Sequence, residues 1–195
     1  MAHQRPAPVR KTRRTDPERR DRIVDACLDV IAEAGVAGAS ARRIAQAADV
    51  PLGSITYHFS GMDELLRVAF ERFADEVSNH FEQRLADARN AQEAEQEVIA
   101  LVTQDVVDTQ RNLILTHELY TLAARRSAFR EIADAWIARS RHALEHCFDP
   151  TTARLLDALL EGLTIRRALD SEPPHPDTVA SAIRRITAGA NQTAG

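Results

Sequence analysis

Apolar residues recur at intervals of three and four along almost the whole chain after residue 16. That spacing matches the period of an α-helix with one buried face, whereas a half-buried strand would alternate apolar and polar residues. Alternating runs are missing from the sequence, and β-branched residues are sparse. The pattern therefore predicts an all-α fold of about nine helices.

Glycine, proline and capping residues divide this periodic sequence into separate helices. Gly35 is expected to stop the first helix, Ser40 can cap the second, and Pro51 can open the third. The expected helices cover residues 17–34, 41–47, 51–58, 62–89, 93–109, 111–126, 128–148, 151–170 and 176–189.

Charge is distributed unevenly along the chain. Basic residues outnumber acidic ones up to residue 62, and the balance reverses beyond it. Residues 1–15 are polar, proline-containing and basic, which is typical of a disordered arm that either follows phosphates or is simply solvated. The asymmetry indicates an N-terminal head that faces nucleic acid, followed by an acidic body.

Two arginines, Arg42 and Arg43, stand at the start of the second expected helix, where the helix dipole disfavours positive charge. An anionic partner would remove this conflict, and a DNA phosphate is a natural one. Ser40 could add its hydroxyl to the same phosphate. The alternative is a pair of solvated arginines with no partner.

The third expected helix is short and has two faces. Ile55 and Phe59 have the spacing to pack on the second helix, while small or flat side chains would point outward into a major groove. Gly53 would let the backbone approach DNA closely. A helix, a tight turn and a reading helix together make a helix-turn-helix. The expected DNA contacts are Ser40, Arg42, Arg43, Pro51, Leu52, Gly53, Ser54, Thr56, Tyr57 and His58.

The stretch GVAGASARRIAQAADVPLGSITYHFSGMDELL, residues 35–66, resembles the head of the TetR family of transcriptional regulators. The shared frame includes a glycine-ended first helix, an Arg-Ile-Ala core, an aromatic–His–Phe run and an acidic–Leu-Leu start. The resemblance covers residues 17–70. The remaining chain fits the family's all-α regulatory domain by its helix count and by the segments HELYTLAARR and LLEGLTI.

Three features depart from the family pattern. Thr56 sits where the family usually has tyrosine, Pro51 and Leu52 replace a common polar pair, and Met62 replaces a lysine that touches phosphate. Phosphate anchoring would then rely more on Ser40, Arg43, Tyr57, His58 and the basic arm.

The resemblance implies a homodimeric regulator, usually a repressor, that binds a palindromic double-stranded DNA operator. Residues 16–61 would form the helix-turn-helix domain and residues 62–195 the helical regulatory and dimerisation domain. A small-molecule effector, mostly apolar, would tilt the fourth helix and release the DNA.

Dimerisation in the resemblance uses the last two helices, which pair across a two-fold axis. Leucines cover more of residues 151–170 than one core face needs, although they could all pack within one chain. The expected interface residues are Leu156, Leu159, Gly162, Leu163, Ile183 and Ile186.

An effector pocket is expected among the fourth to eighth helices, where polar residues interrupt apolar stripes. Asp105 and His117 do so, and a buried ionisable group needs a partner. They either form a buried structural pair or face a cavity and orient a ligand. The expected ligand-binding residues are Phe73, Val77, Asp105, His117, Tyr120 and Trp136.

Other functional classes have weaker support in the sequence. His142 and His146 have a helical spacing that suits a metal, with Cys147 adjacent, but no third ligand is evident, so we expect neither metal nor cofactor. Catalytic motifs are missing, so we expect no enzyme. Two alternatives remain. In one, a partner protein regulates the body, and in the other, the chain is an architectural DNA binder.

With no long apolar run and two distant cysteines, a cytoplasmic protein without a membrane segment is expected.

Overall fold

The computed structural model describes residues 18–103, 109–172 and 174–190, and within these ranges the chain forms nine α-helices and no strand. The helices are α1 (Arg19–Gly38), α2 (Ala41–Ala47), α3 (Gly53–His58), α4 (Met62–Ala86), α5 (Ala91–Thr103), α6 (Thr109–Ala123), α7 (Ser127–Glu145), α8 (Pro150–Leu169) and α9 (Pro176–Ala190). The all-α prediction is confirmed, and each expected helix is present. α2 has the expected ends, the expected end of the fifth helix at residue 109 falls at the start of α6, and the other ends agree within a few residues. The basic arm, residues 1–15, lies outside the described residues.

α1 is interrupted at Gly35, where the regular helix was expected to stop. Gly35 has φ 67° and ψ 172°, a left-handed φ that favours glycine, before the chain makes one more turn to Gly38. A Cβ placed on Gly35 would also lie 2.6 Å from Oε1 of Glu118 in α6. The backbone conformation favours glycine here, whereas the carboxylate of Glu118 is the end of a flexible side chain and could move aside.

α2 and α3 pack on α1 through a short turn. Ser40 caps α2, because its hydroxyl accepts a hydrogen bond from the Arg43 amide at 3.3 Å. After α2, Asp49 adopts a φ of 51°, and the Val50 amide donates to the Ala45 carbonyl at 2.9 Å. This turn sets the angle at which α3 leaves α2.

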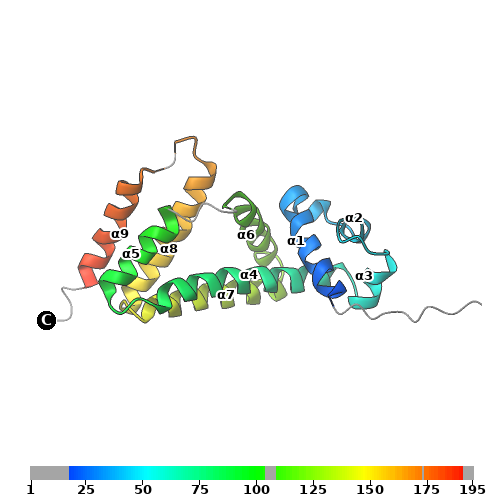
Figure 1. Cartoon of the computed structure of the whole chain (residues 1–195), viewed down its shortest axis with the longest axis horizontal. Coiled ribbons are helices and arrows are strands. Elements are labelled where there is room, and N and C mark those ends of the chain that lie inside the picture. The colour runs from blue at the N-terminus through cyan, green and yellow to red at the C-terminus, as the bar shows by residue number, and fades with distance from the viewer. Residues whose placement is uncertain (1–17, 104–108, 173, 191–195) are drawn as a thin grey trace, which may run out of the picture.

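The helices are arranged as a head, a long shaft and a far end (Figure 1). α1, α2 and α3 form the head. α4 leaves the head and runs beside α7 as the shaft, and α6 stands next to α1. α5, α8 and α9 lie at the end of the shaft away from the head.

The hydrophobic core consists of two clusters of buried side chains. The first joins the head to α4, α6 and the start of α7, and contains Phe70 and Phe129 with an edge-to-face ring contact at 6.1 Å. The second joins the ends of α4 and α7 to α5, α8 and α9. The first cluster crosses the expected domain boundary near residue 62, so the head and the body share one core.

Ion pairs also connect the head to the body. Arg72 of α4 binds Asp21 and Asp25 of α1, with 2.7 Å from its Nη1 to Oδ1 of Asp25. Arg111 of α6 binds Asp29 of α1 at 2.9 Å. Because exposed ion pairs contribute little stability, these contacts set the orientation of the head more than they hold the fold together.

Neither cysteine is in a disulfide, and Cys27 is fully buried, which raises the pKa of its thiol to about 12. Throughout the described ranges, each helix is either too short or too polar to span a bilayer.

Candidate nucleic-acid interface and internal cavity

α3 presents one face to solvent. Leu52 and Tyr57 are 51% and 79% exposed, and Gly53 and Thr56 lie beside them on the same exposed face. A Cβ on Gly53 would meet nothing within 4 Å, so the surface there is open. The Thr56 hydroxyl donates to the Gly53 carbonyl at 3.2 Å. The exposed surface carries one flat aromatic ring among smaller side chains, which suits a major groove.

Ser54 does not belong to this face, and its expected outward direction was wrong. Its side chain is only 8% exposed, beside the buried Ile55. With 100° between successive residues, the inward face of α3 carries residues 54, 55, 58 and 59, and the outward face carries 52, 53, 56 and 57. Polarity suggested an exposed serine, but the helical period places it against the head.

The start of α2 lies beside this surface. Arg42 is exposed, whereas Nη2 of Arg43 lies 3.0 Å from Oε1 of Glu33 in α1. The sequence pattern did not indicate this intramolecular anion. Both side chains are largely solvated, so the pair is weak and Arg43 can exchange Glu33 for a phosphate at small cost.

The other expected DNA contacts lie around α3. Pro51 is exposed at the turn before the helix, and Ser40 is exposed at the start of α2. His58 is half-buried, with its ring edge-on to Tyr57 at 4.9 Å. Met62 is half-buried at the start of α4. Their contacts with DNA remain predictions.

Arg43→Ala is expected to weaken DNA binding and to lower the slope of log K against log salt by about one, because one phosphate contact is lost. Glu33→Gln should act in the opposite direction, since it frees Arg43 from its intramolecular partner. Arg154→Ala, which removes an exposed arginine on α8, is the control. Fluorescence anisotropy at several salt concentrations measures all three, and an unchanged slope for Arg43→Ala would contradict the assignment.

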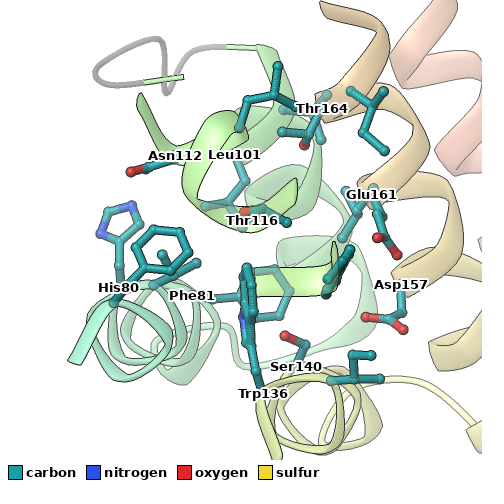
Figure 2. Close-up of a pocket in the computed structure, with 18 residues that line it drawn as sticks. His80, Phe81, Leu101, Asn112, Thr116, Trp136, Ser140, Asp157, Glu161 and Thr164 are labelled. Atoms are coloured by element: carbon teal, nitrogen blue, oxygen red, sulfur yellow. The ribbon is translucent and has the colours of Figure 1, made fainter. Parts of the chain in front are cut away.

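A cavity of ≈ 310 Å³ lies in the body, with walls from α4, α5, α6, α7 and α8 (Figure 2). Four of the expected ligand-binding residues line it: Phe73, Val77, Tyr120 and Trp136. The lining combines side chains from both core clusters, so the cavity lies where the two clusters meet. Ligand sites generally have this character, with apolar walls and a few polar groups.

The acidic groups of the wall differ from the one expected. α8 contributes Asp157 and Glu161, which lie in the wall together with Ser140 of α7. The sequence interpretation included this helix among those around the pocket, but it named only dimer contacts on it. Asp157 and Glu161 interrupt a leucine-rich helix at a spacing of four residues, and that signal could have identified them.

Burial and hydrogen bonds govern the charges around the cavity. Burial raises the pKa of Asp157, and Arg141, with its Nε 2.9 Å from Oδ2 of Asp157, opposes that effect. Burial, together with the charge of Glu161 and a hydrogen bond to it, raises the pKa of Tyr120, so this phenol stays neutral and donates.

His117 is not in the cavity wall, and the expectation that it is buried was wrong. It is exposed on α6, and its Nδ1 lies 2.9 Å from the Leu113 carbonyl one turn earlier. The cavity side of α6 carries residues 112, 113, 116 and 120, and His117 lies beyond the edge of that side, next to the exposed Thr121. Asp105 lies outside the described residues.

Of the expected dimer contacts, two face the chain's own core. Leu156 and Ile183 are fully buried in the second cluster, so neither is available to a partner. Leu159, Leu163 and Ile186 are half-buried against the same cluster, and Gly162 is exposed with open space around it. Since α8 and α9 pack on each other, part of their apolar surface is used within the chain.

Two histidines at the end of α7 meet edge-to-face. His142 and His146 have ring centroids 4.7 Å apart, and Nδ1 of His146 lies 2.8 Å from the His142 carbonyl. The described part of the chain contains no group of three or more His, Cys, Asp or Glu residues placed to hold a metal ion.

A helix-turn-helix head with an exposed reading surface, joined to a helical body that encloses a cavity, defines a DNA-binding transcriptional regulator with a sensor domain. Family models agree with both parts. Residues 23–69 match the bacterial regulatory proteins of the tetR family, and residues 89–189 match the tetracyclin repressor-like C-terminal domain. The chain belongs to the TetR family.

Individual proteins show the same relationship. The crystal structure of a transcriptional regulator from Streptomyces coelicolor A3(2) is 54% identical, with a TM-score of 0.80, and the match covers 88% of this chain and 99% of that one. The multidrug binding protein EbrR complexed with ethidium is 33% identical, with a TM-score of 0.72, over 88% and 99% of the two chains. The transcriptional regulator PksA of Bacillus subtilis is 28% identical, over 85% and 86%.

Proposed function

We propose that this regulator is a homodimeric repressor that binds a palindromic operator and leaves it when a small molecule fills the cavity. Residues 16–61 read the DNA, and residues 62–195 bind the effector and form the dimer. The protein works in the cytoplasm, where the chromosome is.

One observation carries this proposal: the helices that line the cavity also pack on the head. α4 and α6 supply the wall residues Phe73, Val77 and Tyr120. The same two helices contact α1 through the first core cluster and through Arg72 and Arg111. A ligand that moves either helix would therefore change the orientation of the head.

The effect on DNA is a shift between two conformations. The effector has to bind more tightly to the conformation in which the two heads are wrongly spaced for DNA. Packed helices shift as rigid units, so a small displacement at the cavity reaches the head.

The proposed dimer surface is an exposed apolar stripe on α8. Leu155, Ala158, Gly162 and Leu169 are all exposed and recur on one side of the helix. Asp157 and Glu161 lie on a different side, toward the cavity. A self-complementary stripe of this kind is suited to a two-fold interface.

The DNA part of the proposal can be tested by selecting duplexes from a random pool with the purified protein. The expected product is an inverted repeat whose half-sites are centred about one helical turn, ~34 Å, apart. Equal recovery of all sequences would instead indicate an architectural DNA binder.

The effector part can be tested with malachite green, a ligand seen in a crystal structure of the relative EbrR. Binding is followed by dye absorbance without DNA, and operator release is followed with it. Thr116→Phe, which fills the cavity, should abolish both while leaving operator affinity and melting temperature unchanged. The control is Thr121→Phe, on the exposed side of α6. Dye binding that is indifferent to Thr116→Phe would exclude this cavity.

The cavity also helps to decide whether a small molecule or a partner protein regulates the body. A closed, fully packed body would have favoured a partner protein. A cavity of ≈ 310 Å³ with aromatic and acidic walls favours a small molecule.

A further inference from the structure

Arg20 is an exposed cation of the head that lies at the end of the reading helix. It belongs to the first turn of α1, and its guanidinium carbon is 5.2 Å from the centre of the Phe59 ring. Phe59 is the residue that follows α3, and it is only 3% exposed. Figure 1 shows the start of α1 next to the junction of α3 and α4. The fold therefore brings Arg20 to α3, although the two are far apart in the sequence.

The ring of Phe59 holds the guanidinium of Arg20 in one place. A guanidinium is attracted to the face of an aromatic ring, and its N–H groups point outward in the plane, where they can donate to another partner. The ring of His58, an expected DNA contact, lies 6.4 Å from that of Phe59. Because the guanidinium is already positioned, less side-chain freedom is lost when it binds an anion.

Arg20 forms no ion pair within the described part of the chain. Its charge does reach Glu64, in the first turn of α4, but Ser60 occupies that carboxylate. The Ser60 hydroxyl and amide donate to Oε2 of Glu64 at 2.6 Å and 2.7 Å. These two bonds lower the pKa of Glu64, and the charges of Arg67 and Arg20 lower it further. The N–H groups of Arg20 are therefore left for an anion from outside the chain.

A reading helix in the major groove lies between two phosphate backbones. The groove is about 12 Å wide, and phosphate contacts fix the register and orientation of the protein in it. The cations at the start of α2, Arg42 and Arg43, belong to the helix that precedes α3. Arg20 instead lies against the residue that follows α3. The two groups of cations thus flank the reading helix from different elements.

We propose that Arg20 binds a phosphate on the backbone opposite to the one bound at the start of α2, and thereby fixes the angle of α3 in the major groove. The contact adds affinity for any duplex and carries no base preference. The proposal rests on α3 being the reading helix, and it is independent of the cavity and of the effector.

The first test measures the salt dependence of binding to a mixed-sequence duplex. Arg20→Gln keeps a planar group over Phe59 but removes the charge, so it should lower the slope of log K against log salt by about one and weaken binding about fivefold. Arg20→Lys should restore most of the slope, because the charge returns. The control is Arg89→Gln, in the turn between α4 and α5, where the arginine side chain is 85% exposed. The sequence selected from a random pool should stay the same in all three variants.

The second test locates the phosphate. Uncharged methylphosphonates are placed one at a time in the selected operator, and each contacted position should weaken binding of the wild type. Arg20→Gln should become insensitive at one phosphate in each half-site. Arg43→Ala should become insensitive at a different phosphate, on the other strand. Loss of sensitivity on the same strand for both variants would overturn the proposed placement.

The remaining outcomes separate this inference from the proposed function. An unchanged salt slope for Arg20→Gln, in a protein that still binds DNA, would overturn the inference and leave the rest of the head as proposed. A lower melting temperature with an unchanged slope would do the same, because it would assign Arg20 to packing on Phe59 alone. Failure of the wild type to bind any duplex would count against the proposed function as well.

Discussion

Gly162→Arg is expected to produce a monomer that binds the operator about a hundredfold to a thousandfold more weakly than the wild type. Gly162 is exposed at the centre of the apolar stripe on α8, and a Cβ there meets nothing within 4 Å. The chain should therefore fold normally, while the long cation prevents a second α8 from approaching. In the dimer, binding of one head to DNA holds the second head close to its half-site. A monomer loses this high local concentration of the second head.

Sedimentation measures the mass, and DNA anisotropy on a full operator and on a half-site measures the effect of linkage. The monomer should bind the half-site as well as the wild type does, since each head is intact. Glu131→Arg, on the exposed surface of α7, is the control for added charge. An intact dimer of Gly162→Arg would show that the interface lies elsewhere.

Phe70→Ala should lower the free energy of unfolding by about 3–5 kcal/mol, which is the usual result of removing a fully buried phenylalanine. Phe70 lies on α4 at the junction of head and body, packed against Phe129 of α7. For a chain of this size the melting temperature would fall by about 10 °C. Phe70→Leu, which removes less volume, should cost less.

The same variant tests whether the head and body unfold together. Circular dichroism reports all helices, whereas the fluorescence of Trp136 reports the body alone. If the first core cluster joins the two parts, both signals should change at the same temperature in the wild type and in Phe70→Ala. A loss of helix before any change in fluorescence would show that the head unfolds independently.

The local features of the head could be predicted from the sequence because neighbouring residues determine them. Ser40 caps α2 as expected, since a cap depends on the three residues that follow. Gly35 ends the regular part of α1, because its conformation is one that other residues adopt with difficulty. Because these features depend on neighbouring residues only, the motif of residues 35–66 is sufficient to indicate the family.

The direction of individual side chains was less predictable. Ser54 was expected to point outward as a small polar residue, and His117 was expected to point inward because it interrupts an apolar stripe, but each lies on the other side of its helix. Leu156 and Ile183 have the apolar character of an interface, yet they face the core of their own chain. In the sequence, an apolar side chain looks the same whether it packs within its own chain or against a second chain.

The sequence by itself determined the all-α class, the order of the helices and the reading motif, because helical period and caps act over a few residues. Only the tertiary structure decided that Glu33 pairs with Arg43, that Asp157 and Glu161 line one cavity with Trp136, and that one core joins head and body. These contacts bring together helices far apart in the chain, and their geometry depends on how the helices cross. A periodic pattern states that a helix has a buried face, but not which other helix buries it.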